Sequence, residues 1–451
     1  MDYERVLVIG AGKSGIAVSR FLAARGAKVE LTDIKGADEL GKDPASLADM
    51  DIKLSLGAYP AVEAGKYTLV VVSPGVPLTV PPVRRAGELG IPVVGELELA
   101  SRFARAPVVA VTGTNGKTTT TALTGEIFQN AGLRPLVAGN IGKPWIEEAE
   151  GDYDLIVLEV SSFQLETTVT FRPRVGAILN ITPDHLDRHL TMENYVQAKA
   201  RLFANQGPED FAVLNYDDPR TKNLAGVCPG KVLYFSRLAE VPAGACVRDG
   251  WVTFVLEGKR DSILPVGELK IPGSHNLENA LAAVACTRAL GVAPAALADV
   301  LRKFPGVAHR LEFVAEIDGV RYVNDSKGTN PDASIKALLA YRQPIVLIAG
   351  GRNKGSDFTP FVRLIREKAR ALVLLGESAD EIERLARLEG MAVILRAADL
   401  AEAVHLAKNA ARPGDVVLLS PGCASWDMFK NYEERGDLFK QVVREIKVRR
   451  S

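Results

Sequence analysis

The stretch VVAVTGTNGKTTTTAL, residues 108–123, sets a short turn between an apolar run and a threonine-rich segment. The apolar run predicts a buried strand, and the segment after the turn predicts a helix whose first N–H groups can cradle an anion. Gly116, Lys117 and Thr118 form the Gly-Lys-Thr ending of a phosphate-binding loop, although Val111 occupies the earlier position where such a loop usually carries glycine. In this setting the lysine can reach terminal phosphates and the threonine hydroxyl can hold Mg²⁺. We therefore favour a nucleotide site over a plain strand-to-helix turn.

Apolar runs of strand length alternate with amphipathic segments of helix length on both sides of this stretch, which predicts an α/β protein with parallel sheets. With a typical domain of roughly 150 residues, a chain of 451 residues predicts about three domains. We place them at residues 1–105, 106–306 and 307–451.

Two kinds of local pattern give the expected elements. Asp318-Gly319, between alternating apolar residues, predicts a two-residue hairpin turn. Helices are expected from about Lys13 to Arg25 and from near His275. Strands are expected at 5–10, 28–33, 68–75, 91–96, 107–113, 154–162, 175–182, 211–215, 344–351, 371–376, 392–396 and 415–422. Residues 215–264 carry no motif that we can interpret.

Composition narrows the class of protein. Lys+Arg and Asp+Glu both total 55, so no excess of positive charge argues for nucleic acid as a partner. No uncharged apolar run reaches about 18 residues, so we expect no membrane insertion. The four cysteines form no Cys-x-x-Cys pair, which is typical of a reducing compartment, and the acidic start does not resemble a signal peptide. We expect a cytoplasmic protein.

Polar residues follow several expected strands, where open α/β sheets bind their ligands. Glu159 ends the strand in DLIVLE and is a candidate Mg²⁺ ligand, although a glutamate that ends a strand is as often an ordinary surface residue. In NITPDHLDRH, residues 180–189, we favour His185 as a site residue; Asp187 or His189 could instead cap or decorate the next helix. On the residue pattern alone, Lys199 is interpreted as a solvated helical lysine.

The stretch GAGKSG, residues 10–15, competes with the first loop as a nucleotide site. It follows a strand, precedes a helix and is accompanied by Asp33 at the end of the second strand, which is the spacing of a dinucleotide-binding loop. The pattern requires only that a diphosphate approaches the backbone at a helix N-terminus, so NAD, FAD or a nucleotide-diphosphate substrate would satisfy it. A nicotinamide enzyme has no use for a second, Mg²⁺-type loop, which argues against an NAD-dependent oxidoreductase.

Lysines also stand in loops at the ends of C-terminal strands. Lys327 in NDSKGTNPDAS and Lys354 in GGRNKGSDF suit a carboxylate or a phosphate, with solvated loop lysines as the equal alternative. Ser425 and Tyr432 could frame a small acidic substrate, and Tyr432 could equally be a core residue.

Taken together, these motifs resemble the Mur ligase family, the ATP-dependent amide-bond-forming enzymes of peptidoglycan precursor synthesis, over the whole chain. The motifs stand in family order: GTNGKTTT, GNIG (139–142), EVSSFQLE (159–166), NITPDHLDRH, GSHNLENALAA (273–283), HRLE (309–312), NDSKGTN and SPGCASWDMFKNYEERG (420–436). The C-terminal motifs look most like the branch that joins D-glutamate to UDP-N-acetylmuramoyl-L-alanine, and the DNPR stretch of the branch that adds a diamino acid is absent.

The resemblance implies a UDP-substrate-binding Rossmann-like domain, a central P-loop ATPase-type domain and an amino-acid-binding Rossmann-like C-terminal domain. It implies a monomer that uses ATP with Mg²⁺, or Mn²⁺ in its place. It also implies catalytic roles for Lys117, Glu159, His185 and Lys199, metal binding by Thr118, Glu159, His185 and a carbamate on Lys199 (N-carboxylysine).

The remaining implied roles concern the substrates. ATP would be bound by Gly113, Thr114, Asn115, Gly116, Lys117, Thr118, Thr119, Asn276, Asn279, Arg310 and Asp325. The UDP substrate would be bound by Gly12, Ser14, Asp33, Lys35, Ser73, Gly75, Asn140 and Ser161. D-Glutamate would be surrounded by Lys327, Thr329, Lys354, Ser425 and Tyr432, the last standing where the family commonly carries Phe. The alternatives are another Mur-type ligase, a folate polyglutamate ligase or, from another class, the NAD-dependent oxidoreductase.

Overall fold

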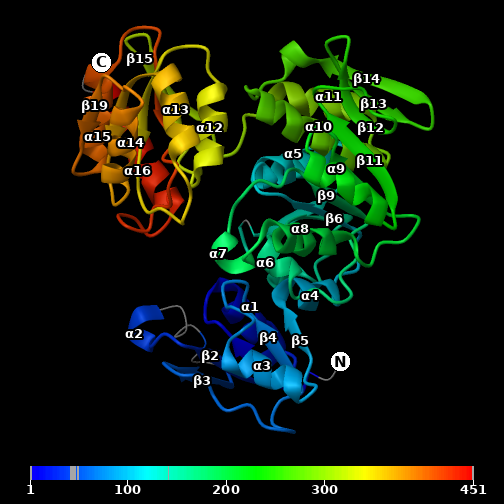
Figure 1. The fold of residues 1–451 in the computed structure, drawn as a ribbon. Coiled ribbons are helices and arrows are strands. Elements are labelled where there is room, and N and C mark those ends of the chain that lie inside the picture. Colours follow the sequence, from blue (N-terminus) through cyan, green and yellow to red (C-terminus); the bar gives the residue numbers. More distant parts are fainter. Residues whose placement is uncertain (1–2, 41–46, 48–49, 141, 449–451) are drawn as a thin grey trace. The chain divides into compact units, whose positions relative to one another are not determined.

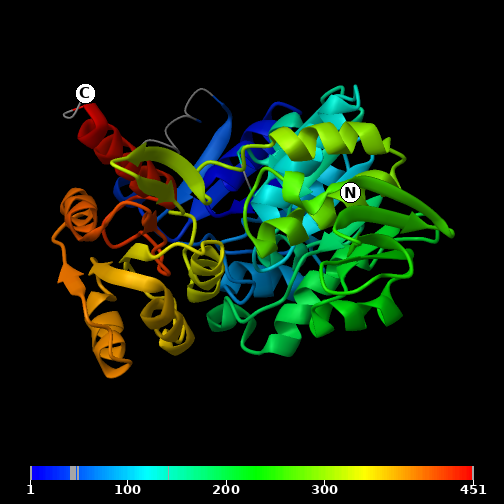
Figure 2. The same cartoon turned by 90° about the horizontal axis from the view of Figure 1, so that it is seen from above.

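The computed structural model describes residues 3–40, 47, 50–140 and 142–448. These residues form three β-sheets whose strands are connected by helices, one sheet after another along the chain (Figures 1 and 2). The expected α/β class with three predominantly parallel sheets is confirmed. By internal contacts the chain divides into two compact units, Met1–Val266 with Asn279–Val300, and Gly267–Glu278 with Leu301–Ser451. The predicted division into three domains, with boundaries near residues 105 and 306, stays a prediction.

The first sheet is parallel and is covered by helices on both faces. Alternate strand residues explain this, because Val6 and Val8 pack in one apolar cluster with helix α1, and Leu7 and Ile9 pack in another with helix α3. The strand order is β3 (Ile52–Leu56), β2 (Lys28–Asp33), β1 (Arg5–Ile9), β4 (Leu69–Val72) and β5 (Val93–Gly95).

The second sheet is the largest and changes from parallel to antiparallel along its width. Its order is β14 (Lys259–Pro265), β13 (Trp251–Leu256), β12 (Gly244–Arg248), β11 (Lys231–Ser236), β10 (Phe211–Asn215), β9 (Val175–Ile178), β6 (Val108–Thr112), β8 (Leu155–Glu159) and β7 (Pro135–Gly139). Strands β12, β13 and β14 pair antiparallel, and the β13–β14 register shifts at Val252/Thr253. These strands lie in the segment for which the sequence offered no motif.

The third sheet has the order β15 (Glu312–Ile317), β16 (Val320–Asn324), β20 (Val416–Leu419), β17 (Ile345–Ala349), β18 (Ala369–Leu374) and β19 (Ile394–Arg396). The predicted hairpin is confirmed: β15 and β16 pair antiparallel around Asp318 and Gly319, whose φ angles are 53° and 74°. Positive φ at both central residues is what a tight type I′ turn requires. The predicted strands generally ran into their following loops, so 68–75 is observed as Leu69–Val72 and 154–162 as Leu155–Glu159.

Helices connect the strands. Helix α1 begins at Lys13, as expected, and ends at Ala23, and α10 begins at Ser274 beside the expected His275. The helices are α1 (Lys13–Ala23), α2 (Ala37–Leu40), α3 (Pro81–Glu88), α4 (Glu96–Ser101), α5 (Lys117–Asn130), α6 (Ser162–Leu165), α7 (Leu186–His189), α8 (Met192–Ala200), α9 (Pro219–Lys222), α10 (Ser274–Ala289), α11 (Pro294–Lys303), α12 (Pro331–Leu339), α13 (Thr359–Lys368), α14 (Ala379–Leu388), α15 (Leu400–Ala410) and α16 (Tyr432–Val448), with the 3₁₀ turns η2 (Trp145–Glu148), η3 (Arg201–Phe203), η4 (Asn223–Val227) and η5 (Val266–Glu268).

Two buried carboxylates of α4 join the first sheet to the second within the first unit. Glu96 accepts a hydrogen bond from the backbone N–H of Ile146 at 2.8 Å. Glu98, which is fully buried, accepts from the backbone N–H groups of residues 169–171 at 2.8–3.0 Å. Because buried acceptors are costly to leave unpaired, these contacts fix α4 against the second sheet.

No helix among the described residues is both long enough and apolar enough to cross a membrane.

Candidate functional site

The predicted phosphate loop lies between β6 and α5, at the carboxyl end of its strand. Gly113 and Gly116 have φ angles of 150° and 90°, which L side chains rarely adopt. A Cβ on Gly116 would also lie 2.2 Å from Oδ1 of Asn279, on the first turns of α10. Both glycines are therefore required by backbone conformation, and Gly116 also by the close approach of α10.

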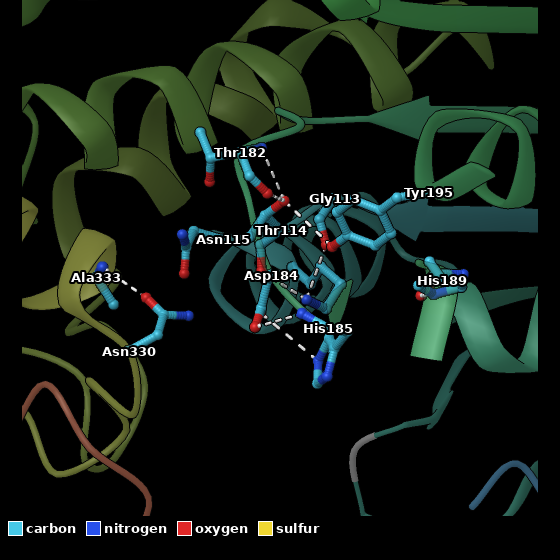
Figure 3. Close-up of polar contacts among 12 residues, drawn as sticks. Gly113, Thr114, Asn115, Thr182, Asp184, His185, His189, Tyr195, Asn330 and Ala333 are labelled. Carbon is cyan, nitrogen blue, oxygen red and sulfur yellow. Dashed lines mark hydrogen bonds and ion pairs between the residues drawn. The ribbon is translucent and has the colours of Figure 1, made fainter. Parts of the chain in front are cut away.

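The loop is fixed by its neighbours, as Figure 3 shows in part. The backbone N–H of Asn115 donates to Oδ1 of Asn180 at 2.9 Å, and Nδ2 of Asn180 returns a bond to the Asn115 carbonyl at 3.0 Å. The Thr114 N–H donates to the Asn180 carbonyl at 2.9 Å. Lys117 lies over its own loop, with Nζ 2.9 Å from the Gly113 carbonyl and 2.8 Å from the Thr114 carbonyl. Thr118 and Thr119 are buried at the start of α5.

Glu159 ends β8 next to the phosphate loop, because β8 pairs with β6 and Glu159 lies opposite Val111. This pairing places the carboxylate beside the loop. The Glu159 side chain is 2% exposed, so it is not the ordinary surface residue of the alternative interpretation. Its Oε1 accepts from Nδ2 of Asn140 at 2.8 Å, whereas Oε2 is buried and makes no hydrogen bond. A buried carboxylate oxygen without a partner is what a bound cation would satisfy.

Lys199 corrects an expectation drawn from the residue pattern. It is not a solvated helical lysine but is 1% exposed, with Nζ 3.1 Å from the Gly113 carbonyl. Its neighbour one turn earlier on α8, Tyr195, places its ring 4.5 Å from Nζ and its hydroxyl 3.2 Å from Oγ1 of Thr114 (Figure 3). Burial, together with the charge of Lys117, holds the pKa of the Lys199 ammonium well below its usual range. This amine is therefore disposed to be neutral.

His185 stands at the start of α7 in a left-handed conformation with φ 54°. Its Nε2 lies 3.6 Å from Oδ2 of Asp184, and its backbone N–H donates to Oδ1 of the same carboxylate at 3.0 Å (Figure 3). Its ring meets the Phe163 ring edge to face at 4.8 Å. The imidazole is 37% exposed, so it remains accessible to a ligand.

The second nucleotide-type loop, GAGKSG, follows β1. A Cβ on Gly15 would lie 1.8 Å from the Gly10 carbonyl, so α1 packs against the loop only because glycine is there. Both carboxylate oxygens of Asp33 accept backbone N–H groups, from Ala11 at 2.8 Å and from Lys35 at 3.0 Å. Asp33 thereby shapes the loop.

The other residues predicted for this loop lie around it. Ser73 donates to the Gly10 carbonyl at 2.9 Å, Ser14 is half-buried, and Gly12 and Gly75 are exposed. Asn140 and Ser161 lie elsewhere, at the ends of β7 and β8. Ser161 caps α6 in a reciprocal pair of hydrogen bonds with Gln164, and Asn140 is the partner of Glu159. Ile141 of the GNIG motif lies outside the described residues.

In the second unit, Asp325 and Arg310 lie close enough to interact. Asp325 is buried, and its oxygens accept from the Ser420 hydroxyl at 2.7 Å and from the Leu311 N–H at 3.2 Å. Burial raises the pKa of the Asp325 carboxyl to about 6, against the opposing charge of Arg310. The buried Nε of Arg310 makes no hydrogen bond. Asn276 and Asn279 lie three positions apart on α10, where the two compact units divide.

Three loops of the third sheet are brought together by backbone bonds. The Gly422 N–H donates to the Gly328 carbonyl at 2.9 Å, and Arg352 and Ala424 exchange two backbone bonds at 2.9 and 3.0 Å. These bonds join the loops that carry the residues predicted for an acidic amino acid, namely Lys327 and Thr329, Lys354, and Ser425.

The side chains predicted to bind the acidic amino acid are half-buried or buried. Nζ of Lys327 lies 5.1 Å from the centre of the Tyr432 ring, which also meets His309 edge to face at 6.1 Å. Lys327, Lys354 and Tyr432 are half-buried and Ser425 is buried, so Tyr432 is not a fully buried core residue. The roles of the two lysines stay predictions.

Several residues around these sites had not been predicted. Asn180 and Tyr195 hold the phosphate loop, and Arg188, Glu166 and His189 form a linked cluster between α6 and α7. Asn180 could have been found, because it directly follows a strand at the end where ligands bind. The contacts of the others depend on tertiary packing, and no local pattern marks them.

Comparisons with known proteins agree with this organisation. The Mur ligase MurD-like N-terminal domain matches residues 4–95, the Mur ligase middle domain matches 111–287, and the glutamate ligase domain of Mur ligases matches 309–423. The fold resembles the solved structure of UDP-N-acetylmuramate-alanine ligase MurC from Thermotoga maritima, with a TM-score of 0.60 and 20% identity over 98% of this chain and 99% of that chain.

Relatives of known name are similar along the whole chain. The UDP-N-acetylmuramoylalanine--D-glutamate ligase of Pelotomaculum thermopropionicum is 61% identical over 446 residues, which cover 98% of each chain. The ligase of the same name from Alkaliphilus metalliredigens is 48% identical over 448 residues, again 98% of each. Together with the three matched domains, these similarities show that the chain belongs to the Mur ligase family.

Proposed function

We propose that this protein joins D-glutamate to UDP-N-acetylmuramoyl-L-alanine at the expense of ATP, in peptidoglycan precursor synthesis. The observation that carries the proposal is the similarity to relatives named for this reaction, which extends over 98% of the chain. The glutamate ligase domain matched at residues 309–423 supports the acidic amino acid as the second substrate.

ATP is proposed to place its phosphates on the loop from Gly113 to Thr119. The backbone there is shaped for an anion by two glycines with positive φ, and Lys117 lies over the loop, where it can turn to phosphate oxygens. Asn276, Asn279, Arg310 and Asp325 are proposed to position the rest of the nucleotide; the buried, unpartnered Nε of Arg310 supports an anionic neighbour.

A divalent cation suits the residues beside this loop. Oε2 of Glu159 is buried without a partner, and the Thr118 side chain is buried at the first turn of α5, so both can supply hard oxygen ligands. Mg²⁺ bound there, or Mn²⁺ in its place, would neutralise charge that develops on phosphate oxygens.

Lys199 is proposed to carry a carbamate that joins His185 in holding a second cation. A neutral amine adds CO₂ and loses a proton to give a carbamate anion, and burial already disfavours the charged form of this amine. The carbamate would place an anionic oxygen ligand close to the Gly113 carbonyl, where the Lys199 amine now lies.

The reaction then has two steps on the substrate carboxylate, which is by itself a poor acyl donor. The alanyl carboxylate takes the γ-phosphoryl group and ADP leaves, with Lys117 stabilising charge on the transferred group. The neutral amine of D-glutamate attacks the resulting acyl phosphate, phosphate leaves and the amine gives up a proton. Asn140 and Ser161 are proposed to face the reacting end of the UDP substrate.

The UDP substrate and D-glutamate are each assigned their own set of residues. The diphosphate is proposed to lie on GAGKSG with Gly12, Ser14, Asp33, Lys35, Ser73 and Gly75. D-Glutamate is proposed to lie among Lys327, Thr329, Lys354, Ser425 and Tyr432, where two lysines suit its two carboxylates. A monomer in the cytoplasm, with domain boundaries near residues 105 and 306, completes the proposal.

The test is release of ADP with UDP-N-acetylmuramoyl-L-alanine, ATP and Mg²⁺ against a panel of amino acids. We expect D-glutamate to stimulate turnover and L-glutamate, L-alanine and diamino acids to fail. Stimulation by another amino acid would point to a different Mur ligase, and activity on a folate with L-glutamate would point to a polyglutamate ligase. Turnover that ignored D-glutamate would refute the assignment.

A further inference from the structure

Arg188, in the short helix α7, contacts the Ser73–Gly75 segment, which carries two of the residues proposed for the UDP substrate. Its Nη1 donates to the Pro74 carbonyl at 2.9 Å, in the segment Ser73–Gly75 that follows β4. The segment is itself tied to the first nucleotide-type loop, because Ser73 donates to the Gly10 carbonyl at 2.9 Å. Arg188 lies three residues after His185, so its side chain links the Ser73–Gly75 segment to the helix that begins next to His185.

The guanidinium is held in place by groups of the second sheet's own helices. Nε and Nη2 of Arg188 both donate to Oε2 of Glu166, at 3.2 and 2.6 Å, and its Cζ lies 4.4 Å from the centre of the Phe163 ring. The two charged side chains are only 15% and 19% exposed. Because Nε and Nη2 both bind the Glu166 carboxylate and the guanidinium is planar, the direction of Nη1 is fixed. A lysine ammonium cannot provide this arrangement.

The cluster extends to the start of α6. Oε1 of Glu166 lies 3.3 Å from Nδ1 of His189, and Nε2 of His189 lies 2.9 Å from the Ser162 hydroxyl. His189 is buried, and Ser162 directly follows Ser161. The chain of contacts therefore runs from Pro74 through Arg188, Glu166 and His189 to the turn that carries Ser161.

We infer that Arg188 is a positioning residue that holds the Ser73–Gly75 segment in the conformation that receives the substrate diphosphate. The inference rests on the proposed function for the identity of the substrate. Proline fixes φ at position 74, so the direction of its carbonyl depends on ψ alone, and the bond from Arg188 restrains that angle. Without the bond, the segment would sample other ψ values and the substrate would have to order it on binding.

The experiment compares Arg188→Met, Arg188→Lys and a matched control, Arg201→Met. Arg201 also donates to backbone carbonyls, those of Leu165 and Thr168, although it is more exposed than Arg188. Both carbonyls lie at or just after the end of α6 rather than in the Ser73–Gly75 segment. Methionine keeps much of the side-chain volume, so packing is changed little.

Two readouts separate positioning from stability. In the protein alone, we expect amide hydrogen exchange at Val76, whose N–H donates to the Ser73 carbonyl at 2.9 Å, to be about tenfold faster in Arg188→Met and unchanged in Arg201→Met, relative to wild type. In turnover, we expect KM for the UDP substrate to rise about tenfold in Arg188→Met, equivalent to about 1.4 kcal/mol, with KM for ATP within about twofold of wild type. In Arg188→Lys, both the exchange rate and KM should lie between those of wild type and Arg188→Met, because an ammonium keeps the charge but cannot bind Glu166 through two nitrogens.

The inference would be overturned if either the exchange rate or the ratio of the two KM values were unchanged in Arg188→Met. It would also be overturned if Arg201→Met showed the faster exchange and the raised KM expected for Arg188→Met. If Arg188→Met does not fold, the same comparison with Arg188→Lys decides. A wild type without D-glutamate-dependent turnover would refute the proposed function, but the exchange measurement would still decide the role of Arg188.

Discussion

Replacing Gly116 by alanine tests why the phosphate loop has its shape. Gly116 has a φ of 90°, and a Cβ there would lie 2.2 Å from Oδ1 of Asn279. Gly132, just beyond the end of α5, has a similar φ of 85° but has no atom within 4 Å of its Cβ position. Gly132→Ala therefore isolates the backbone cost, and the difference between the two variants isolates the contact with α10.

The magnitudes follow from these two geometries. A non-glycine residue in the left-handed region costs roughly 1–2 kcal/mol, which is the expected loss of unfolding free energy in Gly132→Ala. Displacing Asn279 adds the cost of overpacking, about 1–3 kcal/mol, so Gly116→Ala should lose about 2–5 kcal/mol. Urea unfolding followed by circular dichroism measures both values, and ADP titration calorimetry should show weakened binding only in Gly116→Ala.

A partner change makes the reasoning refutable. Asn279→Ala removes the atom that a Cβ on Gly116 would meet, so Gly116→Ala/Asn279→Ala should lose less stability than the sum of the two single variants. If Gly116→Ala cost no more than Gly132→Ala, or if the double variant were additive, the close approach of α10 would not be what requires glycine.

Three further predictions concern single charged residues. Lys117→Ala should lower kcat by at least about 100-fold, because one preorganised group that stabilises transferred charge is removed; a near-normal rate in the ADP-release assay would contradict this. Lys199→Ala should be inactive and be rescued by short carboxylic acids that supply the missing oxygens, and full activity without them would remove the carbamate from the proposal. Burial, with a smaller contribution from Glu147, raises the pKa of Glu96 from 4.5 to about 7. The folded protein therefore favours the protonated form of Glu96, and the stability that this form contributes is present below pH 4.5 and lost as pH rises through 7. Over that window the unfolding free energy of wild type should fall by up to about 3 kcal/mol relative to that of Glu96→Gln, measured by urea unfolding at each pH. Parallel pH profiles of the two proteins would show that Glu96 does not titrate there.

Features fixed by short stretches of sequence could be predicted. The order of β6, turn and α5, and the hairpin at Asp318-Gly319 follow from local periodicity and turn chemistry. The sequence also indicated that Glu159 ends a strand, whereas its position beside the turn depends on the pairing of β8 with β6. The strand ends were less accurate, because the expected ranges included turn residues such as Ser73–Gly75, where the backbone has already left the sheet.

Features that depend on packing could not be predicted. The sequence around Lys199 is that of an exposed helical lysine. It is buried because α8 packs against the phosphate loop, with Tyr195 on the same face of the helix. Strands β12 to β14 were missed because their short mixed sequences carry no decisive pattern and are stabilised by pairing with one another. Nothing in the motif LDRH distinguishes Arg188 from other arginines, because its contact with Pro74 joins residues that are far apart in the sequence.

The antiparallel end of the second sheet has a consequence for how molecules of this protein meet one another. Strand β14 is an outer strand, whose free N–H and C=O groups could add a strand from another chain. It begins with Lys259, Arg260 and Asp261, it ends at Pro265, and its pairing with β13 is interrupted by the register shift. Charged residues, proline and irregular pairing all discourage the addition of another strand, so the edge strand β14 is protected against edge-to-edge aggregation.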